Sequence, residues 1–362
     1  MRNIGAGGLQ DLICAMVEGA GSDQEEAEQV SANLVKANLM GHDSHGVHLV
    51  PRYLENVRNS VLQPNAHVTV ESDLGPILQL HGNMGYGQII GAEAMELGVS
   101  RAAEMGVAIV ALRFSHHLGR IGAWGELCAK AGLVSIHYVN VIGHPPLVSP
   151  FGGAEARYST NPYCTAIPAP PGGDPIVLDM ATSKIAMGKV AVAHNKGVEV
   201  PEGSLINPNG ASTRDPGVMF RDPRGALLSF GDHKGSGLAI VAEILSGALV
   251  NGGTCTPPNQ TTGTIQNNML TIIINPKYLG DEDFFVKELA EITDYVKSAQ
   301  PARGVDKVLV PGDPERISIV NRDRDGIPLD DTTWGSLVDA AVTVGIPAET
   351  ASNMVEILSV SD

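Results

Sequence analysis

The feature that most constrains this chain is a short apolar run, VAIVAL at residues 107–112, that directly follows the helix-like segment 91–106. Such a run of β-branched and small apolar residues is typical of a strand buried inside a sheet. Further strand-like runs lie on either side of it, at residues 67–70, 77–80 and 133–139. Because strands and helices alternate here, the middle of the chain predicts an α/β or mixed α+β sheet.

The two ends of the chain have helical patterns instead. Ser22 with Glu25 matches a capping box, and apolar residues then recur at helical spacing until Gly41 ends the run. Near the other end, residues 334–345 and 347–358 predict two short helices. The ends therefore predict a helical region that both termini build.

The length of 362 residues allows two domains. We expect residues 1–65 and 303–362 to form the helical one, with the C-terminal part packing on the N-terminal part. We expect residues 66–302 to form the sheet domain. No internal repeat or low-complexity tract interrupts this division.

The net charge of −16 and the pI of about 5.0 exclude nucleic acid and anionic membrane as expected partners, because both need a basic face. No apolar run approaches the length of a membrane span. The four cysteines are scattered and form no CxxC pair, which predicts reduced thiols in a cytoplasmic protein.

The common nucleotide-binding patterns are missing. A Rossmann domain needs GxGxxG between a strand and a helix, but the glycine-rich stretches at 82–88 and 231–237 have other spacings. A P-loop pattern is also missing. A standard dinucleotide or nucleoside triphosphate fold is therefore not expected.

The stretch GHDSHGVHLVPRY, residues 41–53, is the densest group of polar side chains, and it leaves three hypotheses open. Its histidines, with Asp43 and the later His116 and His117, could bind a metal, although HExxH is absent. One histidine held by a polar neighbour, as in DSH, could transfer a proton. The third hypothesis is a polar loop with structural hydrogen bonds only.

Three further segments are suited to anions. SHHLGRIG at 115–122 follows the buried strand, and its glycines and arginine could approach a phosphate. In DMATSKIAMGK at 179–189, the Thr-Ser pair is predicted to open a helix, whose free N–H groups could bind an anion or simply be capped. DHKGSG at 232–237 places a lysine beside glycines at another helix start.

Together these motifs resemble one family. GHDSHGVHLVPRY, SHHLGRIG, STNP, LDMATS, HKGSGLA, TIIIN and VPGDPE occur in the order typical of the malate/L-lactate dehydrogenase-like family. The resemblance covers nearly the whole chain. It implies a non-Rossmann fold that binds NAD, with NADP as the alternative, and a homodimer acting on a small 2-oxo or 2-hydroxy acid.

The resemblance also implies roles for individual residues. His45 would be the proton donor and acceptor, and Ser44 would hold it. The implied cofactor contacts lie in the motifs above: His45, His117, Gly119, Arg120, Ile121, Asp179, Met180, Ala181, Thr182, Ser183, Lys234, Asn267, Pro311, Gly312, Asp313 and Pro314. The implied substrate side comprises Leu49, Arg52, Thr160, Met187 and Lys189.

Two substrate positions depart from the family pattern. Leu49 and Met187 stand where many members carry arginine, which predicts a roomier and less polar pocket. Arg52, Arg120 and Lys189 are then the candidate cations for the substrate carboxylate. The expected activity is an NAD(P)-dependent 2-hydroxycarboxylate dehydrogenase. The alternatives are a reductase of cyclic ketimine carboxylates on the same fold and a metal-dependent hydrolase that uses the histidine cluster.

Overall fold

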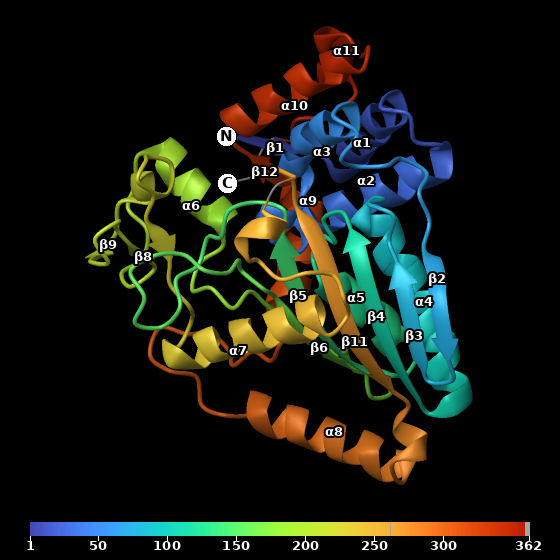
Figure 1. The fold of residues 1–362 in the computed structure, drawn as a ribbon. Coiled ribbons are helices and arrows are strands. Elements are labelled where there is room, and N and C mark those ends of the chain that lie inside the picture. The colour runs from blue at the N-terminus through green and yellow to red at the C-terminus, as the bar shows by residue number, and fades with distance from the viewer. Residues whose placement is uncertain (261, 359–362) are drawn as a thin grey trace.

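A mixed seven-stranded sheet forms the centre of the molecule (Figure 1). The structure is a computed structural model that describes residues 1–260 and 262–358. In spatial order the strands are β2 (Thr69–Leu74), β3 (Ile77–His81), β4 (Val107–Ser115), β11 (Gln266–Ile274), β5 (Val134–Ile142), β6 (Tyr163–Ile167) and β7 (Ile176–Met180). Only β3 and β4 pair in parallel. The predicted mixed α/β class is confirmed.

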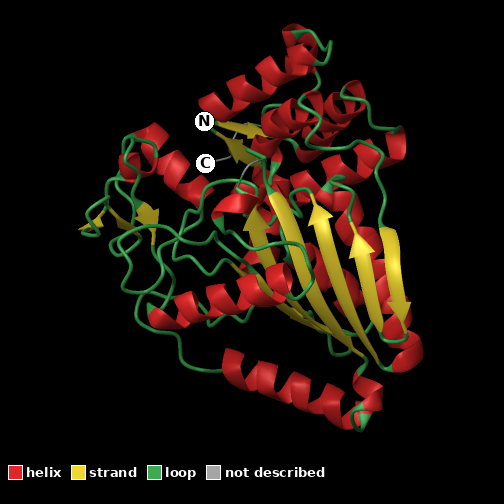
Figure 2. Cartoon of the chain, in the orientation of Figure 1, coloured by secondary structure: helices red, strands yellow, loops and turns green. Residues whose placement is uncertain are grey.

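Helices cover both faces of this sheet (Figure 2). On one face, α4 (Gly87–Met105) and α5 (Gly122–Lys130) share a core with the strands, in which Trp124 packs close to Gly91. On the other face, α7 (His233–Glu243) and the π-helical turn Ile244–Ala248 lie against β5 and β11. The helix α8 (Glu282–Lys297) extends beyond the end of the sheet (Figure 1).

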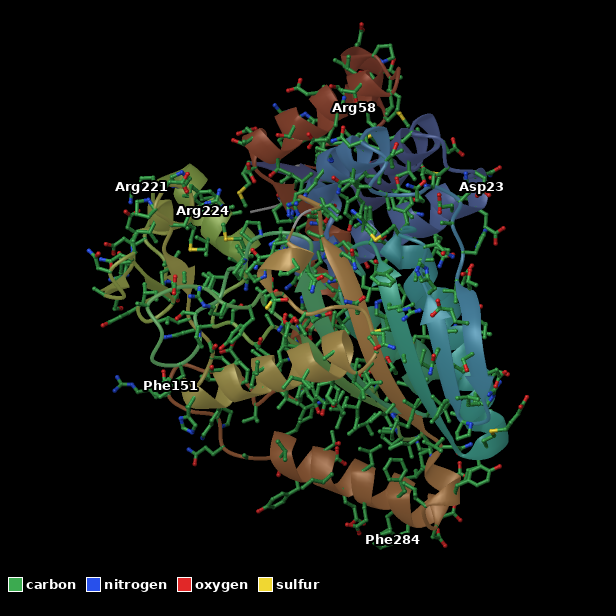
Figure 3. All side chains as sticks on the ribbon, in the orientation of Figure 1. Asp23, Arg58, Phe151, Arg221, Arg224 and Phe284 are labelled. Carbon is green, nitrogen blue, oxygen red and sulfur yellow. The ribbon has the colours of Figure 1, made fainter. Side chains whose placement is uncertain are left out.

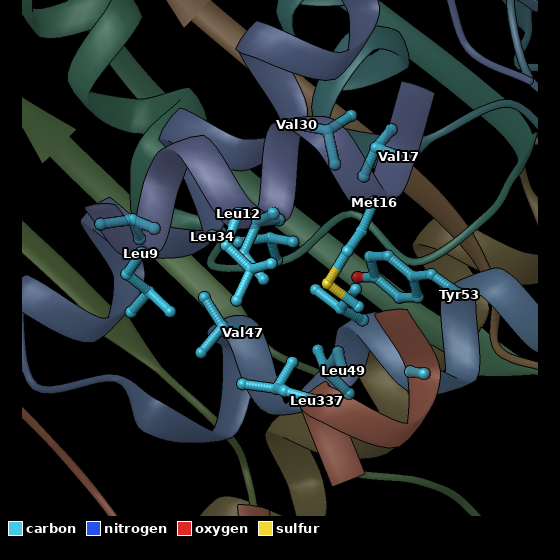
Figure 4. Close-up of a cluster of buried hydrophobic side chains, with 14 of the residues drawn as sticks. Leu9, Leu12, Met16, Val17, Val30, Leu34, Val47, Leu49, Tyr53 and Leu337 are labelled. Carbon is cyan, nitrogen blue, oxygen red and sulfur yellow. The ribbon is translucent and has the colours of Figure 1, made fainter. Parts of the chain in front are cut away.

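Both ends of the chain contribute to one helical region. It contains α1 (Ala6–Gly19), α2 (Gln24–Leu39), α3 (Val50–Arg58), α9 (Asp313–Asp325), α10 (Asp331–Thr343) and α11 (Ala348–Asn353). The short strands β1 (Arg2–Ile4) and β12 (Ile327–Leu329) pair antiparallel and join the two ends. Figure 4 shows Leu337 of α10 packed among N-terminal side chains such as Val47 and Leu49. The exact residue boundaries of the two domains stay a prediction.

A third apolar cluster, which the sequence did not suggest, lies beside the sheet. It gathers buried residues such as Val148, Tyr158 and Val190 around α6 (Met187–Lys196) and a small sheet of three strands. These strands are β8 (Leu205–Ile206), β9 (Ser212–Thr213) and β10 (Ala226–Leu227). Each has only two residues, which is too short for an alternating pattern to reveal.

Two local predictions were wrong. The cap of α2 is Asp23 rather than Ser22, because the Asp23 carboxylate accepts the Glu26 N–H at 2.9 Å while the Ser22 hydroxyl is turned inward. The Thr-Ser pair does not open a helix either. α6 begins at Met187, because Thr182 and Ser183 continue from β7 in extended backbone that bonds to Thr160 and bridges to Ser229.

The helices of the described residues fall short of what a membrane crossing requires in length and apolar character.

Candidate active site

His45 lies on a tight turn between α2 and α3, made of two 3-10 segments, Asp43–His45 and Val47–Leu49. The Nδ1 atom of His45 is 3.0 Å from the Ser44 hydroxyl oxygen. Burial lowers the pKa of His45 to about 3, and the neighbouring His42, His48 and Arg120 act in the same direction. The ring is therefore neutral at pH 7 and can accept a proton.

Asn38 of α2 holds this turn in place. Its side-chain oxygen accepts the Val47 N–H at 2.8 Å, and its amide nitrogen donates to Asp43 at 2.7 Å. A Cβ at Gly46 would come within 2.1 Å of the Asn38 amide oxygen, so the turn needs glycine there. The glycine of the DSHG motif thus follows from close packing.

The C-terminal helix α9 contacts the same turn twice. Arg322 makes two parallel bonds to the Asp43 carboxylate, at 2.6 and 2.9 Å. Glu315 lies 3.1 Å from His42 Nε2. Burial raises the pKa of Glu315, but the hydrogen bond to His42 outweighs it, and the pKa is lowered overall. Asp43, the carboxylate of the metal hypothesis, is therefore paired with Arg322 instead of being open to a metal ion. No group of three potential metal ligands converges among the described residues.

The structure brings His117, but not His116, to His45. The rings of His45 and His117 stack with centroids 5.6 Å apart and an angle of 18°. His117 Nδ1 is 2.6 Å from the Tyr53 hydroxyl. His116 instead contacts Asn56, and its Nε2 is 2.9 Å from the Asn56 amide nitrogen. Burial is the main cause that lowers the pKa of both histidines.

The site occupies one edge of the central sheet, where β4, β5 and β7 end and β6 and β11 begin (Figure 1). At this edge Asn267 accepts the Leu118 N–H at 2.8 Å and donates to the Asn140 carbonyl at 3.0 Å. Both ends of its amide are therefore used to position the loop after β4. The cofactor contact implied for Asn267 stays a prediction.

Arg120 and Asp179 lie together below this loop. The Asp179 carboxylate accepts the Gly122 N–H at 2.6 Å, and burial raises the pKa of Asp179 while Arg120 opposes that effect. Arg120 is 4% exposed and binds Glu126 at 2.7 Å. Because Glu126 neutralises it, Arg120 is a weak candidate for the substrate carboxylate.

The start of α6 packs on the turn that carries His45. A Cβ at Gly188 would come within 2.9 Å of Ser44 Cβ, so the first turn of α6, with Met187 and Lys189, lies beside this turn. The substrate contacts implied for these two residues stay a prediction. Lys189 is exposed, and no carboxylate pairs with it among residues 1–260 and 262–358. Arg52 donates to the Gly263 carbonyl at 3.2 Å and lies close enough to help lower the pKa of His117 after burial and the other histidines.

Leu49 departs from expectation. Its side chain is 9% exposed and belongs to the helical core, next to Leu337 (Figure 4). An apolar residue here stabilises the contact between the two ends of the chain, so Leu49 is not placed as an open pocket wall. Of the two positions where arginine was expected, Leu49 lies within the turn but faces the core, whereas Met187 is only partly buried.

Thr160 lies at the same sheet edge, where its carbonyl accepts both the N–H and the hydroxyl of Thr182, at 2.9 and 2.8 Å. The next residue, Asn161, donates at 2.6 Å to the buried Glu243 carboxylate. Glu243 also accepts from Asn140 and from a backbone N–H, so amides alone satisfy it. The Asn161 side-chain oxygen is buried with no partner among the described residues.

The turn Pro311–Pro314 lies beside β7, since the Val177 N–H reaches the Pro311 carbonyl at 3.3 Å. Gly312 has φ 98°, which a residue with a side chain would rarely adopt. Hydrogen bonds from the Val310 N–H, Arg316 and Lys297 outweigh burial and lower the pKa of Asp313 to about 2.

Lys234 is exposed in the first turn of α7, after two residues of positive φ, Gly231 and Asp232. The remaining implied cofactor positions lie in the segments just described: Gly119 and Ile121 in the loop after β4, and Met180, Ala181 and Ser183 at and beyond the end of β7. The loop after β4 and the segment 179–183 thus meet at one edge of the sheet, where His117 stacks on His45. The cofactor contacts implied for Lys234 and the turn 311–314 stay a prediction.

The sequence profile of the malate/L-lactate dehydrogenase family matches residues 4–338. The chain belongs to this family. It is 44% identical over 344 residues to hydroxycarboxylate dehydrogenase B of Escherichia coli K12, covering 94% of each chain. The family resemblance is confirmed, and with it an oxidoreductase that acts on 2-hydroxy acids with a nicotinamide cofactor.

Solved structures of the family agree with this fold. An E. coli protein described as a malate/lactate dehydrogenase superposes with a TM-score of 0.93 at 42% identity, with 98% of each chain covered. A Δ1-piperideine-2-carboxylate reductase from Pseudomonas syringae superposes with a TM-score of 0.79 at 28% identity, covering 94% of this chain and 100% of that one.

Sequence reasoning missed the residues that position the site, chiefly Asn38, Tyr53, Glu315 and Arg322. A signal existed for Asn38, because it lies four residues after Leu34 on the buried face of a helix, where a polar side chain needs a partner. No pattern in the sequence marks Glu315 or Arg322, since their partners lie more than 270 residues away.

The lowered histidine pKa values predict a pH-dependent stability. His45, His48, His116, His117, His137 and His144 have lowered pKa values in the folded protein. The unfolded chain therefore binds more protons below about pH 6.5, so the free energy of unfolding should fall from about pH 6.5 to about pH 4.5. A fully buried histidine contributes up to about 1.4 kcal/mol per pH unit. Urea titrations at each pH measure this slope.

The matched control for that slope is His137→Gln. His137 is 0% exposed, lies on β5 between Ser135 and Thr271, and is not implied in the site. In this variant the free energy of unfolding should depend less steeply on pH, by the contribution of one buried histidine. The exposed His67, whose pKa the Glu93 hydrogen bond raises, opposes the trend only as a single group. A stability that stays constant across the window would contradict the neutral, buried state of these rings.

Proposed function

We propose that this chain is an NAD(P)-dependent 2-hydroxycarboxylate dehydrogenase that also reduces the corresponding 2-oxo acids. The observation that carries the proposal is the neutral His45, held by Ser44, stacked on His117 and adjacent to the implied cofactor segments. In oxidation His45 accepts the proton of the substrate hydroxyl. In reduction it returns that proton to the carbonyl oxygen.

Because the pKa of His45 is low, we propose that the bound substrate helps to protonate this ring. A histidine that is neutral at pH 7 is ready to act as a base, but donation requires the protonated ring. A substrate carboxylate beside His45 favours the charged ring and raises its pKa. Binding of the anionic 2-oxo acid therefore prepares His45 for donation.

The donor set of the site fits a nicotinamide dinucleotide, which accepts or supplies the hydride when bound. Lys234 has no carboxylate partner among the described residues, so it can meet a diphosphate. Gly119 and Gly312 have positive φ and bring the backbone close to a ligand. The residues that would hold the cofactor are those of the loop after β4, the segment 179–183, Lys234 and the turn 311–314.

We propose NAD as the cofactor, with NADP as the alternative. The low pKa of Asp313 keeps this carboxylate negative at neutral pH, beside the turn 311–314. Asp174, which pairs with Arg316, adds a second negative charge nearby. Because Arg316 and Lys297 already pair with these two carboxylates, neither cation is free for an additional phosphate on the cofactor ribose.

We propose Arg52 as the cation for the substrate carboxylate. Its influence on the pKa values of His116 and His117 supports a position near these two histidines, of which His117 stacks on His45. It has no carboxylate partner among the described residues, whereas Arg120 is bound to Glu126. Thr160 and Met187 then complete the substrate side, with Lys189 as the alternative cation.

The alternative is reduction of a cyclic ketimine carboxylate. The structural likeness to the P. syringae piperideine carboxylate reductase supports it. Such a substrate offers the same carboxylate to Arg52 and an imine nitrogen, instead of a carbonyl oxygen, to His45. Comparing both substrate classes with NADH and NADPH distinguishes the two activities.

The four free thiols support the cytoplasmic location that we also propose.

We propose that the protein is a homodimer joined through α7 and α8. Large apolar side chains on and around these helices are 39–78% exposed: Phe151, Ile240, Val241, Ile244, Leu249, Tyr278, Leu279, Phe284, Ile292, Tyr295 and Val296. Figure 3 labels Phe151 near one end of α7 and Phe284 on α8. Together they offer on the order of 800 Å², one partner's share of a standard interface, and more than a monomer usually leaves exposed.

The first test replaces the proposed proton carrier. His45→Ala should lower kcat on the order of 10²-fold or more, because no other group delivers the proton, while the Kd for NADH stays within about twofold. His67→Ala, at an exposed histidine outside the site, is the control and should leave both unchanged. Near wild-type turnover of His45→Ala would remove His45 from the mechanism.

The second test concerns substrate choice. With Met187 in place of an arginine, kcat/KM for phenylpyruvate should exceed that for oxaloacetate, because a buried ring gains roughly 1 to 3 kcal/mol and the second carboxylate lacks a partner. Met187→Arg should shift this ratio towards oxaloacetate, and Met187→Leu should leave it unchanged. A tenfold preference of the wild type for oxaloacetate would refute the apolar pocket.

The third test measures the assembly. Light scattering should give twice the 37.9 kDa mass of one chain. The variant Ile244→Glu, on the proposed surface, should shift the mass towards one chain, since a charge is buried at the interface. Leu74→Glu, at an exposed apolar position on the edge strand β2 outside the proposed surface, should remain dimeric. A monomeric wild type, or a dimer that Ile244→Glu does not weaken, contradicts this surface.

A further inference from the structure

Tyr53 connects the helical core to the active site. Its ring lies on α3, is 1% exposed and packs in the core that both ends of the chain share (Figure 4). Its hydroxyl leaves this core and lies 2.6 Å from His117 Nδ1. The ring is thus fixed by apolar packing, while its one polar atom is directed at a histidine that stacks on His45.

The direction of the Tyr53 hydrogen bond follows from its second neighbour. The amide nitrogen of Gln88, a fully buried residue of α4, lies 3.4 Å from the Tyr53 hydroxyl oxygen and donates to it. Since the Gln88 nitrogen can only donate, His117 Nδ1 is the one acceptor among the described residues that bonds to the Tyr53 hydroxyl, and we assign the hydroxyl proton to this bond. Burial raises the pKa of Tyr53, so the hydroxyl keeps that proton at neutral pH.

This hydrogen bond decides where His117 carries its own proton. A neutral imidazole that accepts at Nδ1 must hold its hydrogen at Nε2. Among the described residues no group bonds to His117 Nε2. This atom is not among the fully buried ones, so a ligand can reach it. The Nε2–H is therefore a free donor next to the ring of His45.

We propose that Tyr53 is a positioning residue that fixes the His117 tautomer, so that His117 donates Nε2–H to an oxygen of the 2-oxo acid. This inference rests on the proposed function and deepens it. His45 moves the proton, whereas His117, which the family resemblance implies as a cofactor contact, stays neutral and binds the substrate instead. A fixed donor binds the substrate oxygen without any cost for rotating or exchanging a proton first.

The chain offers a matched control in Tyr86. This second buried tyrosine contacts Tyr53 edge-to-face, with ring centroids 6.0 Å apart. Its hydroxyl is also buried, but it has no hydrogen-bond partner among the described residues. Tyr53→Phe and Tyr86→Phe therefore remove the same atom from the same core, and only the first loses a bond to His117.

The experiment combines kinetics with the tautomer itself. Tyr53→Phe should lower kcat/KM for the 2-oxo acid about tenfold, the value of one such hydrogen bond, with the Kd for NADH unchanged. Tyr86→Phe should stay within about twofold of the wild type. In the background of His117→Gln, whose side chain has no tautomer to fix, Tyr53→Phe should have no further effect.

Two-bond ¹H–¹⁵N spectra of histidine-labelled protein report the tautomer directly, with His117 identified by its loss in His117→Gln. The wild type should show Nε2–H, and Tyr53→Phe should show a mixture of both tautomers. An Nδ1–H form in the wild type, an unchanged tautomer in Tyr53→Phe, or equal kinetics of the two phenylalanine variants would overturn the inference. If His45→Ala is inactive while these outcomes occur, only the role of Tyr53 fails. If His45→Ala is fully active, the proposed function fails as well.

Discussion

The double hydrogen bond between Arg322 and Asp43 is the interaction on which the arrangement of the site depends. It fixes the catalytic turn to α9, and α9 begins at the turn 311–314 that we assign to the cofactor. Asn38 fixes the other side of the same turn. The position of His45 is therefore fixed from two sides, by Asn38 of α2 and by Arg322 of α9. Partly exposed ion pairs contribute little on average, but a bidentate pair with shared partners is more effective.

The electrostatics of the site differ from those of the whole molecule. The chain carries a net charge of −16, yet its proposed substrate is an anion. The site reduces this conflict locally, because His45 and His117 are neutral and the nearby carboxylates are already bound to arginine, backbone N–H or histidine partners. Arg52, Lys189 and Lys234 remain without a carboxylate among the described residues. A few such cations at short range outweigh distant carboxylates that solvent and salt screen.

The sequence predicted the parts of the fold that local pattern encodes. The strand after residue 106 and the helical ends follow from periodicity, and Gly41 ends α2 with φ 82° as expected. Ordered motifs identified the family, and they also predict the turn that carries His45 as the catalytic one. The strand order, with β11 inserted between β4 and β5, could not be predicted, because it depends on pairing between segments more than 100 residues apart. Leu49 shows the same limit: its motif position suggested a pocket, but tertiary packing placed it in the core.

The pairing of Asp43 with Arg322 spans 279 residues, and this separation has a consequence for biosynthesis. During translation the catalytic turn is made early, but its arginine partner emerges only when almost the whole chain has been synthesised. Until then Asp43 and Asn38 lie in a segment whose apolar surface still lacks α10 and β12. Contacts of such long range close slowly, because the intervening chain must first lose its freedom. A ribosome-bound chain can therefore complete its sheet, whose last strand in sequence is β11, only shortly before Arg322 fixes the turn that carries His45.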